Sequence, residues 1–450
     1  MKGGVLRYAQ DDGRERQGCC PPEAMHTTGI GFEDRLLTDE EIRSTVLGAL
    51  GGVDVAGKRA LLILPDHTRT APIGQLFRLI HEAWGAQAAK LDCLIALGTH
   101  PPMSDEMIYQ RVGITAAEHA STFSKVRFFN HLWKDPDSLV QIGALSAAEI
   151  GEITNGLFEL EVKITVNRMI FDYDLLLIVG PVFPHEVIGF SGGNKYLFPG
   201  IAGQHIIDFF HWLGAVITNP VINGNKWTPV RRVVDRAAAM VQTPKLALSL
   251  VVSGERLAGL YFGAPEESWS QAADLSEKLH IIYKDHPFHT VLSCAPRMYD
   301  DIWTAGKCMY KLEPVVADGG TLIIYAPHIR EISATHGHII EEVGYHTRDY
   351  FLRNWDRFQQ YPWGVLAHST HVRGIGCVEG ENEKPRVNVV LATQISPETC
   401  AKISLGYMDP ETVNPEDYAN REEEGVLYVP KAGEILYRLK NAPPELGGQG

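Results

Sequence analysis

Short apolar runs recur along the chain, and the first three each end in a polar loop. They are Ala60–Leu64, Leu91–Leu97 and Leu175–Val179, and helix-length segments separate them. Continuous apolar runs of this length are typical of strands buried on both faces of a parallel sheet. Strands that alternate with helices predict an α/β architecture with mostly parallel sheets.

The segments between these runs carry the helical period. Leu76, Ile80 and Trp84 follow helical spacing within residues 73–89, and residues 266–283 also resemble a helix. Further apolar runs follow at 290–294, 321–325 and 387–391. We therefore predict a disordered extension (1–25), an N-terminal α/β domain (26–285), a second α/β domain that closes over it (286–425), and a tail that packs back (426–450).

The polar loops at the predicted strand ends carry side chains suited to chemistry. Asp66 and Arg69 follow the first run, His100 the second and His185 the third. Ligands of open α/β sheets bind outside the carboxyl ends of the strands, which predicts one shared site. Asp66 is suited to orient Arg69 or a histidine. The structural alternative is that residues 66–72 are a helix N-cap with ordinary ion pairs.

Composition narrows the class of protein. The 450 residues are 45% hydrophobic and carry a formal net charge of -14, which disfavours a nucleic-acid binder. The seven cysteines form no CxxC pair, which predicts reduced thiols. The chain has no membrane-length apolar run, and its first residues lack the apolar stretch of a signal peptide. We expect a cytoplasmic protein without a membrane or nucleic-acid partner, either alone or as an oligomer.

The segment 181–212 is the richest in candidate chemistry. Gly192 and Gly193 precede Lys195, and His211 follows in an apolar setting. Glycines let backbone amides approach a phosphate, although a glycine-rich turn without a ligand explains them equally well. Lys195 is either a solvated surface residue or a phosphate-binding or covalent lysine. His211 is either a core histidine or a metal ligand.

Two pairs of residues suggest how a small acid would be handled. His100 and His185 fit a two-base racemase, in which one histidine accepts a proton while the other donates one. Arg69 and Lys307 are suited to hold a carboxylate. In the alternative, the two histidines never meet and the cations form ion pairs elsewhere.

A second group of histidines keeps another hypothesis open. It comprises His336, His338, His346, His368 and His371. A His-x-His pair can bind zinc, but the spaced cysteine or carboxylate partners of a strong zinc motif are missing. This group favours a zinc-dependent hydrolase or lyase as the competing enzyme class.

Taken together, these motifs resemble the lactate racemases that depend on a nickel-pincer nucleotide. The segments that carry the resemblance are 66–69, 96–100, 184–185, 192–195, 199–203 and the single residue His211, in the order and approximate spacing of that family. Lys307 and Trp363 extend the resemblance more loosely into the second half. Each motif alone is modest, and the set is specific.

The resemblance implies two α/β domains with the active site in the cleft between them. It implies a nickel-pincer nucleotide, pyridinium-3-thioamide-5-thiocarboxylate mononucleotide, joined to Lys195 and with His211 as the protein ligand to nickel. The cofactor contacts would also include Asp66, Gly192 and Gly193. His100 and His185 would be the catalytic acid/base pair, and the carbinol carbon of a 2-hydroxy acid would be inverted by hydride transfer.

The same resemblance implies a substrate site and leaves the substrate open. Arg69, Lys307, Thr304 and Trp363 would contact the substrate. The family's type member carries glutamine three residues before the substrate lysine, where this chain has Thr304. The shorter side chain favours a larger, hydroxyl-rich substrate such as a sugar acid; racemisation of lactate, malate or another short hydroxy acid is the alternative. A further alternative is a protein of this fold that binds the cofactor or a sugar acid without turnover. Cofactor-synthesis proteins are the expected partners.

Overall fold

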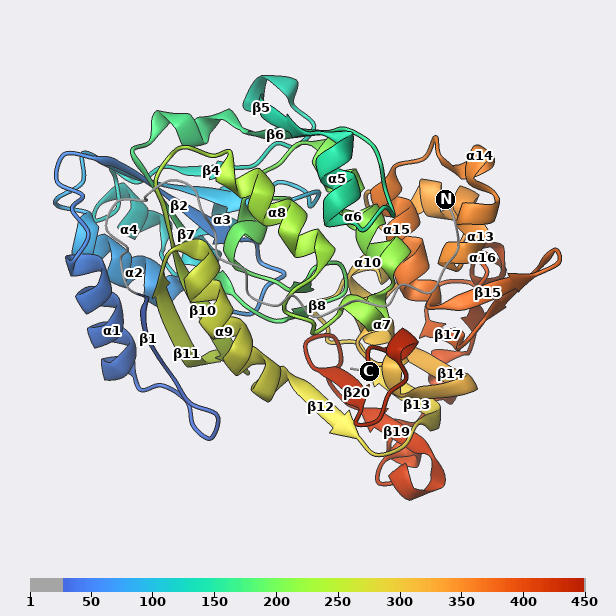
Figure 1. Ribbon diagram of the computed structural model, residues 1–450. Helices are drawn as coiled ribbons and strands as arrows, with labels where there is room; N and C mark the ends of the chain where they lie inside the picture. The colour runs from blue at the N-terminus through green and yellow to red at the C-terminus, as the bar shows by residue number, and fades with distance from the viewer. Residues whose placement is uncertain (1–26, 449–450) are drawn as a thin grey trace.

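Two parallel-rich sheets organise the protein. The computed structural model describes residues 27–448, so the extension predicted for residues 1–25 lies outside the described residues. A seven-stranded sheet is built from the first half of the chain and a five-stranded sheet from the second, with helices around each. Figure 1 shows the two sheets as separate lobes. The predicted α/β class with mostly parallel sheets is confirmed.

The first sheet has a parallel centre and an antiparallel edge. Its strands, in spatial order, are β1 (Thr28–Gly31), β11 (Arg256–Gly263), β10 (Lys245–Ser253), β7 (Leu175–Pro181), β2 (Arg59–Pro65), β3 (Lys90–Ala96) and β4 (Phe128–Asn130). All pairs from β10 to β4 are parallel, whereas β11 pairs antiparallel with both β10 and β1. The three apolar runs that predicted buried strands are β2, β3 and β7.

Helices cover both faces of this sheet, as the side chains of β2 show. Leu62 and Leu64 pack into one apolar core, while Leu61 and Ile63 pack into another on the opposite face. The first core also holds α1 (Asp39–Gly51), α2 (Ile73–Trp84) and α3 (Asp105–Val112). The second holds α5 (Ala147–Ile153), α6 (Gln204–Ile217) and α8 (Pro229–Ala239). Because both faces are buried, the strands read as unbroken apolar runs.

The second sheet is wholly parallel. Its strands, in spatial order, are β18 (Gly406–Tyr407), β17 (Asn388–Thr393), β14 (Val316–Ala326), β13 (Phe288–Cys294) and β19 (Val426–Val429). The helices of this lobe are α10 (Ile302–Ala305), α11 (Lys307–Tyr310), α12 (Gly337–Val343), α13 (Arg348–Arg353), α14 (Trp355–Phe358), α15 (Trp363–Arg373) and α16 (Pro397–Lys402).

The lobes are joined by a shared core and by a two-stranded ribbon. One apolar core runs without a break from α6 to α15 and onto the second sheet. After α9 (Pro265–His280), β12 (Ile281–Lys284) leads into the second lobe and pairs in parallel with β20 (Leu436–Leu439). The segment predicted as a tail thus supplies β19 to the second sheet and β20 to the connection between the lobes. Figure 1 shows this ribbon below the first sheet.

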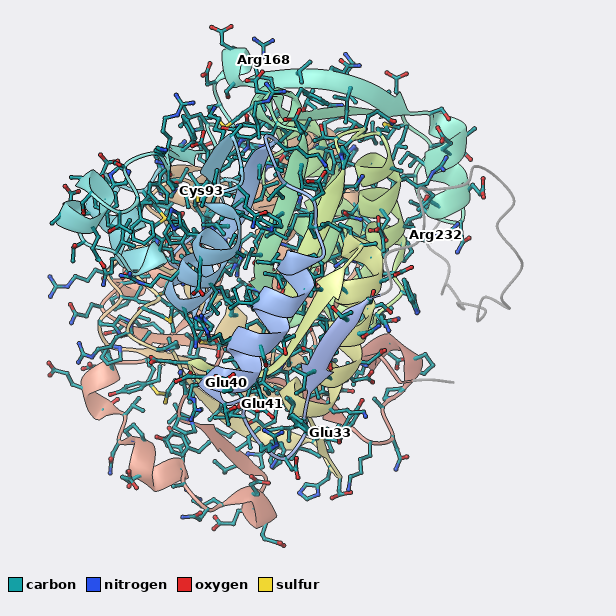
Figure 2. The ribbon with its side chains drawn as sticks, turned by 90° about the vertical axis from the view of Figure 1, so that its left-hand side faces the viewer. Glu33, Glu40, Glu41, Cys93, Arg168 and Arg232 are labelled. Atoms are coloured by element: carbon teal, nitrogen blue, oxygen red, sulfur yellow. The ribbon has the colours of Figure 1, made fainter. Side chains whose placement is uncertain are left out.

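Most cysteines of the described residues are buried and none is paired. The five cysteines among residues 27–448 are unpaired, and four of them are buried. Figure 2 shows Cys93 in the body of the molecule, while Glu40, Glu41 and Arg232 lie toward the outside. Within the described residues, no helix has the length and apolar character needed to cross a membrane.

Candidate active site

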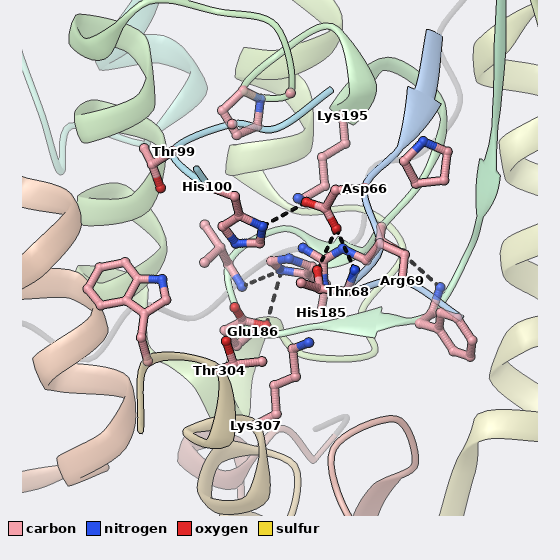
Figure 3. Close-up of a pocket in the computed structure, with 18 of the residues that line it drawn as sticks. Asp66, Thr68, Arg69, Thr99, His100, His185, Glu186, Lys195, Thr304 and Lys307 are labelled. Atoms are coloured by element: carbon pink, nitrogen blue, oxygen red, sulfur yellow. Dashed lines mark hydrogen bonds and ion pairs between the residues drawn. The ribbon is translucent and has the colours of Figure 1, made fainter. Parts of the chain in front are cut away.

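One cavity between the lobes gathers most of the residues that the sequence singled out. It is lined by Asp66, Arg69, His100, His185, Gly192, Lys195, His211, Thr304 and Lys307. Figure 3 shows side chains from both halves of the chain converging on it. The interdomain cleft is therefore present, and its residues come from loops far apart in the sequence.

Strand topology explains this convergence. β7, β2 and β3 are neighbours in the sheet and run parallel, so their carboxyl ends lie along one edge. Asp66 directly follows β2, and His100 lies in the loop after β3. His185 ends the short strand β8 (Pro184–His185), which follows β7 and pairs with β9 (Gly189–Phe190). The second lobe adds Thr304 from α10 and Lys307 from α11.

The glycine segment turns the chain sharply and brings Lys195 to the cavity. Gly192 has a φ of 88° and Gly193 a φ of 56°. A Cβ on Gly192 would lie 2.6 Å from the Val182 side chain, and one on Gly193 would lie 2.9 Å from that of Trp269. Both glycines are required by packing. Gly192 reaches the cavity wall, but Gly193 is buried and lines no part of it, so the structure does not place Gly193 at a cofactor.

Two other expectations differ from the structure. Trp363 does not line the cavity; its indole packs against Trp355 and donates to the Gln359 carbonyl, while the next residue, Gly364, reaches the wall. The alternative that residues 66–72 cap a helix through Asp66 also fails. α2 begins at Ile73, so Asp66 is too far from its first turn to serve as the cap.

Asp66 forms a dyad with His100 instead of pairing with Arg69. Its Oδ2 lies 2.7 Å from His100 Nδ1, and its Oδ1 accepts hydrogen bonds from the backbone and hydroxyl of Thr68. Burial alone would raise the Asp66 pKa, but the His100 ring, Arg69 and Thr68 together hold that pKa well below its usual range. Because this ionised carboxylate only accepts, His100 Nδ1 carries a hydrogen, and in the neutral tautomer of the ring the lone pair is on Nε2.

His185 has the opposite tautomer. The backbone N–H of Val187 donates to His185 Nδ1 at 3.2 Å, so a neutral ring carries its hydrogen on Nε2. Burial and the nearby charges of Lys195 and Arg69 lower the His185 pKa well below its usual value and keep the ring neutral. Glu186 Oε2 lies 3.3 Å from the same Nδ1. In this state, the His100 ring offers the cavity a lone pair and the neutral His185 ring offers it an N–H donor.

Cations crowd the same cavity. Burial and the charge of Arg69 lower the pKa of Lys195 to about 7 and that of Lys307 to about 8. Burial also lowers the pKa of Lys311 to about 7, and its ammonium donates to the Pro184 carbonyl. Arg69 and Lys307 are thus placed to attract a carboxylate. Lys195 can exist as a neutral amine near neutral pH, the form that reacts as a nucleophile.

His211 is arranged as a potential metal ligand. Its Nδ1 lies 2.6 Å from the carbonyl of Ile207, one turn earlier on α6, so Nδ1 carries the hydrogen. Burial lowers the His211 pKa to about 4, which leaves Nε2 with a free lone pair at neutral pH. An imidazole held in this way by a carbonyl is a common arrangement for metal ligation.

These features test whether the implied cofactor fits. Lys195 supplies an amine that is uncharged for part of the time, and His211 supplies one imidazole nitrogen on the same cavity. Among residues 27–448, no three His, Cys, Asp or Glu side chains form a metal-binding group. A metal held here would take its remaining ligands from an organic group. The residues present therefore fit a metal-carrying cofactor attached to Lys195.

The second histidine group does not form the expected zinc cluster. His346 pairs with Glu383 at 2.6 Å and stacks on Tyr350. His336 and His368 both pack against Trp303, with ring centroids 4.6 Å and 4.1 Å away. The zinc-dependent hydrolase or lyase therefore lacks its ligand set within the described residues.

Sequence reasoning did not single out every residue of the cavity wall. Glu186 and Lys311 were missed, although Glu186 adjoins His185 and Lys311 lies one helical turn after Lys307. His368 and His371, which the zinc hypothesis also used, line this cavity as well. Their spacing of three residues on α15 is the signal that both lie on one face.

Comparisons with known proteins agree with this architecture. The family model described as the lactate racemase N-terminal domain matches residues 49–222. The lactate racemase of Thermoanaerobacterium thermosaccharolyticum is 24% identical over 60% of this chain and 60% of its own length. The lactate racemase of Lactiplantibacillus plantarum is 25% identical over 66% of this chain and 67% of its own. The match thus spans less than two thirds of the first relative.

Solved structures extend the likeness over nearly the whole chain. The crystal structure of a Thermotoga maritima protein is 31% identical, with a TM-score of 0.83 over 91% of this chain and 100% of that one. The lactate racemase apoprotein of T. thermosaccharolyticum shares the fold, with 18% identity and a TM-score of 0.66 over 88% of this chain and 92% of that one.

Fold and site define a two-lobed α/β protein with a polar interdomain cavity, two histidines in opposite tautomers and a perturbed lysine. The family match and its relatives give this class a name. The chain is a homologue of the lactate racemases, and the family model matches part of its N-terminal domain.

Proposed function

We propose that this chain is a nickel-pincer nucleotide-dependent racemase or epimerase of a 2-hydroxy acid, and that its substrate is larger and richer in hydroxyls than lactate. The observation that carries the proposal is the pairing of His100 and His185. Both line one cavity, and their Nδ1 atoms are engaged so that one Nε2 accepts and the other donates. Inversion at a carbinol carbon needs a base for the hydroxyl proton and is helped by a donor to the carbonyl oxygen that forms.

The cavity residues have separate roles in binding the carboxylate and in proton transfer. Arg69 and Lys307 bind the carboxylate, Arg69 by a planar fork and Lys307 by a point charge. The Nε2 of His100 takes the hydroxyl proton, and Asp66 stabilises the imidazolium that results. When bound, the cofactor supplies hydride transfer to and from the carbinol carbon. The flat keto acid can receive the hydride on its other face, and the proton held on His100 returns to the oxygen, to which the neutral His185 ring donates a hydrogen bond from Nε2.

Lys195 and His211 are assigned to the cofactor. The low pKa of Lys195 favours the neutral amine that a covalent bond requires, and His211 offers one ring nitrogen to nickel. Cofactor-synthesis proteins are the partners that such an enzyme needs. Enclosure between the lobes keeps water from the keto acid during the hydride exchange.

The substrate preference rests on three residues of the cavity wall, Thr304, His368 and His371. Thr304 leaves more room than glutamine would, and His368 and His371 make this wall polar. Asp301, which the sequence also offered, accepts from the Thr304 backbone and caps α10. A small acid such as lactate, the substrate in the names of the relatives, would leave this wall without contacts.

The experiment begins with intact-protein mass spectrometry and nickel analysis after co-expression with cofactor-synthesis proteins. We expect a mass gain that maps to Lys195, about one nickel per chain, and inversion of an aldonate faster than of lactate. Lys195→Met is the matched control and should lack the mass gain. Unmodified Lys195 in nickel-free protein, or lactate turnover equal to that of every aldonate tried, would contradict the proposal.

A further inference from the structure

A histidine-bearing helix, α15, forms part of the cavity wall. His368 and His371 lie three residues apart on α15, and both line the cavity. The N-terminus of α15 is fixed to the first lobe because the backbone N–H of Gly364 donates to Asp208 on α6 at 3.0 Å. The two histidines are therefore held in place against the helix that carries His211.

His371 lacks the partners that a buried histidine normally has. His371 is only 3% exposed, and neither of its ring nitrogens has a hydrogen-bond partner among the described residues. The Tyr310 ring packs edge-on at 6.0 Å between centroids but satisfies neither nitrogen. Buried polar atoms without partners are rare in folded proteins and need an explanation. A bound ligand would supply the missing hydrogen bonds.

The protonation state of the His371 ring indicates which ligand group it can bind. Burial lowers its pKa to about 4, so at neutral pH the ring is uncharged and offers one donor and one acceptor. Arg69 and Lys307 are cations and suit a carboxylate, whereas the His371 ring is uncharged. A hydroxyl both donates and accepts, so it matches either nitrogen of a neutral imidazole.

The neighbouring side chain makes this wall rigid. The ring of His368 stacks on Trp303 at 4.1 Å, and its Nε2 lies 3.3 Å from the Tyr345 hydroxyl. His336 packs against the same indole at 4.6 Å, so both sides of Trp303 are supported by rings. A rigid polar wall discriminates better than a mobile one, because less conformational freedom is lost when the ligand binds.

We propose that His371 is a specificity-determining residue that binds hydroxyls on the substrate chain beyond the reacting carbon. The enzyme thereby selects polyhydroxy acids over lactate. This inference rests on the proposed function for its chemistry, but not for its geometry. Arg69 and Lys307 bind the carboxylate, and His371 binds the hydroxylated chain.

The test compares His371→Phe with wild type and uses D-gluconate and lactate as probes. Phenylalanine keeps a ring but loses both nitrogens. In the nickel-loaded enzyme, we expect kcat/KM for gluconate to fall about 10- to 100-fold further than kcat/KM for lactate, the loss typical of deleted hydrogen bonds in a buried site. His338→Phe, an exposed histidine that does not line the cavity, is the matched control and should leave the ratio unchanged.

Two further readouts do not depend on turnover. Gluconate binding to the cofactor-free protein, measured by calorimetry, should weaken about 10-fold or more in His371→Phe. The Tm of the unliganded variant should be equal to or above that of wild type, because unpaired buried nitrogens have been removed. A structural histidine would give a lower Tm. Should the phenylalanine variant fail to fold, His371→Asn, which keeps a donor and an acceptor, should retain the gluconate preference.

The outcomes separate the two proposals. If wild type carries nickel and the Lys195 adduct but inverts neither acid, the proposed function is wrong, and gluconate binding still decides the role of His371. Equal losses for both acids, unchanged gluconate binding, or absence of gluconate binding by wild type would overturn the role of His371. Loss of nickel from His371→Phe with the adduct intact would also overturn it, because His371 would then be a metal ligand.

Discussion

Replacing Asp66 by asparagine tests the acid/base assignment with almost no change in shape. The Thr68 backbone N–H donates to Oδ1 of Asp66 at 2.9 Å, and a backbone N–H cannot accept. The asparagine oxygen must therefore face Thr68, which directs its NH₂ group toward His100 Nδ1. An NH₂ group donates, so Nδ1 becomes an acceptor and the hydrogen moves to Nε2. His100 would then have no lone pair for the substrate hydroxyl.

The size of the effect follows from the buried dyad. Asp66 is 3% exposed, so solvent screens its interaction with the His100 imidazolium only weakly. Opposite charges about 4 Å apart attract by about 4 kcal/mol at an effective dielectric constant of about 20. Losing this attraction in the state that contains the His100 imidazolium corresponds to about a 10³-fold lower rate. A wrong histidine tautomer in a serine protease costs about 10⁴-fold. We expect kcat for Asp66→Asn to fall by about 10³- to 10⁴-fold.

The assay follows inversion by chiral chromatography in protein matched for nickel and for the Lys195 adduct. Thr68→Val is a useful companion because it removes the hydroxyl bond at 2.6 Å and keeps both the carboxylate and the backbone donor. It should lose much less activity than Asp66→Asn. A fall below about 10-fold for Asp66→Asn, with the adduct intact, would refute the dyad as the origin of the base.

Three other predictions address the buried cations. Because the pKa of Lys195 is about 7, an acylating reagent should modify it in the cofactor-free protein with half-maximal rate near pH 7, while surface lysines should require a pH near 10; mass spectrometry of the peptides distinguishes them. Between the Lys195 pKa of about 7 in the folded protein and the ordinary lysine pKa of about 10, the folded protein binds fewer protons than the unfolded chain, so the free energy of unfolding rises with pH. Lys195→Met should lower the slope of this rise by about 1 kcal/mol per pH unit, as measured by urea unfolding at several pH values. Lys311→Met should lower kcat about 10- to 100-fold with little change in KM, because the bond that holds Pro184 beside His185 is lost; an unchanged kcat would contradict this role.

The sequence predicted the parts of the site that follow directly from strand ends. Buried strands leave an apolar run, and parallel neighbours bring the residues after each run to one edge. Asp66, His100 and His185 could therefore be placed together without a structure. The apolar runs also located β13, β14 and β17 in the second half to within a few residues.

What could not be predicted depends on contacts between the lobes. His371 and Lys311 reach the cavity only because α15 packs on α6 and α11 faces the β8 hairpin. Such packing leaves no local pattern, so the histidines after residue 336 could equally suggest zinc. The partner of Asp66 was also undetermined, because Arg69 is close in sequence and His100 is close in space. Trp363 was misplaced by one position, since Gly364 faces the cavity and the indole faces Trp355.

The paired strands β12 and β20 have a mechanical consequence. The backbone passes between the lobes through β12 and returns beside it through β20, and Arg438 on β20 donates to the Asn223 carbonyl of the first lobe. A single linker can swivel in any direction, whereas a hydrogen-bonded ribbon resists torsion and flexes mainly about one axis. Together with the apolar core that the lobes share, this ribbon holds them in one register, so Lys307 keeps its position relative to Arg69 and the carboxylate always meets the same pair of charges.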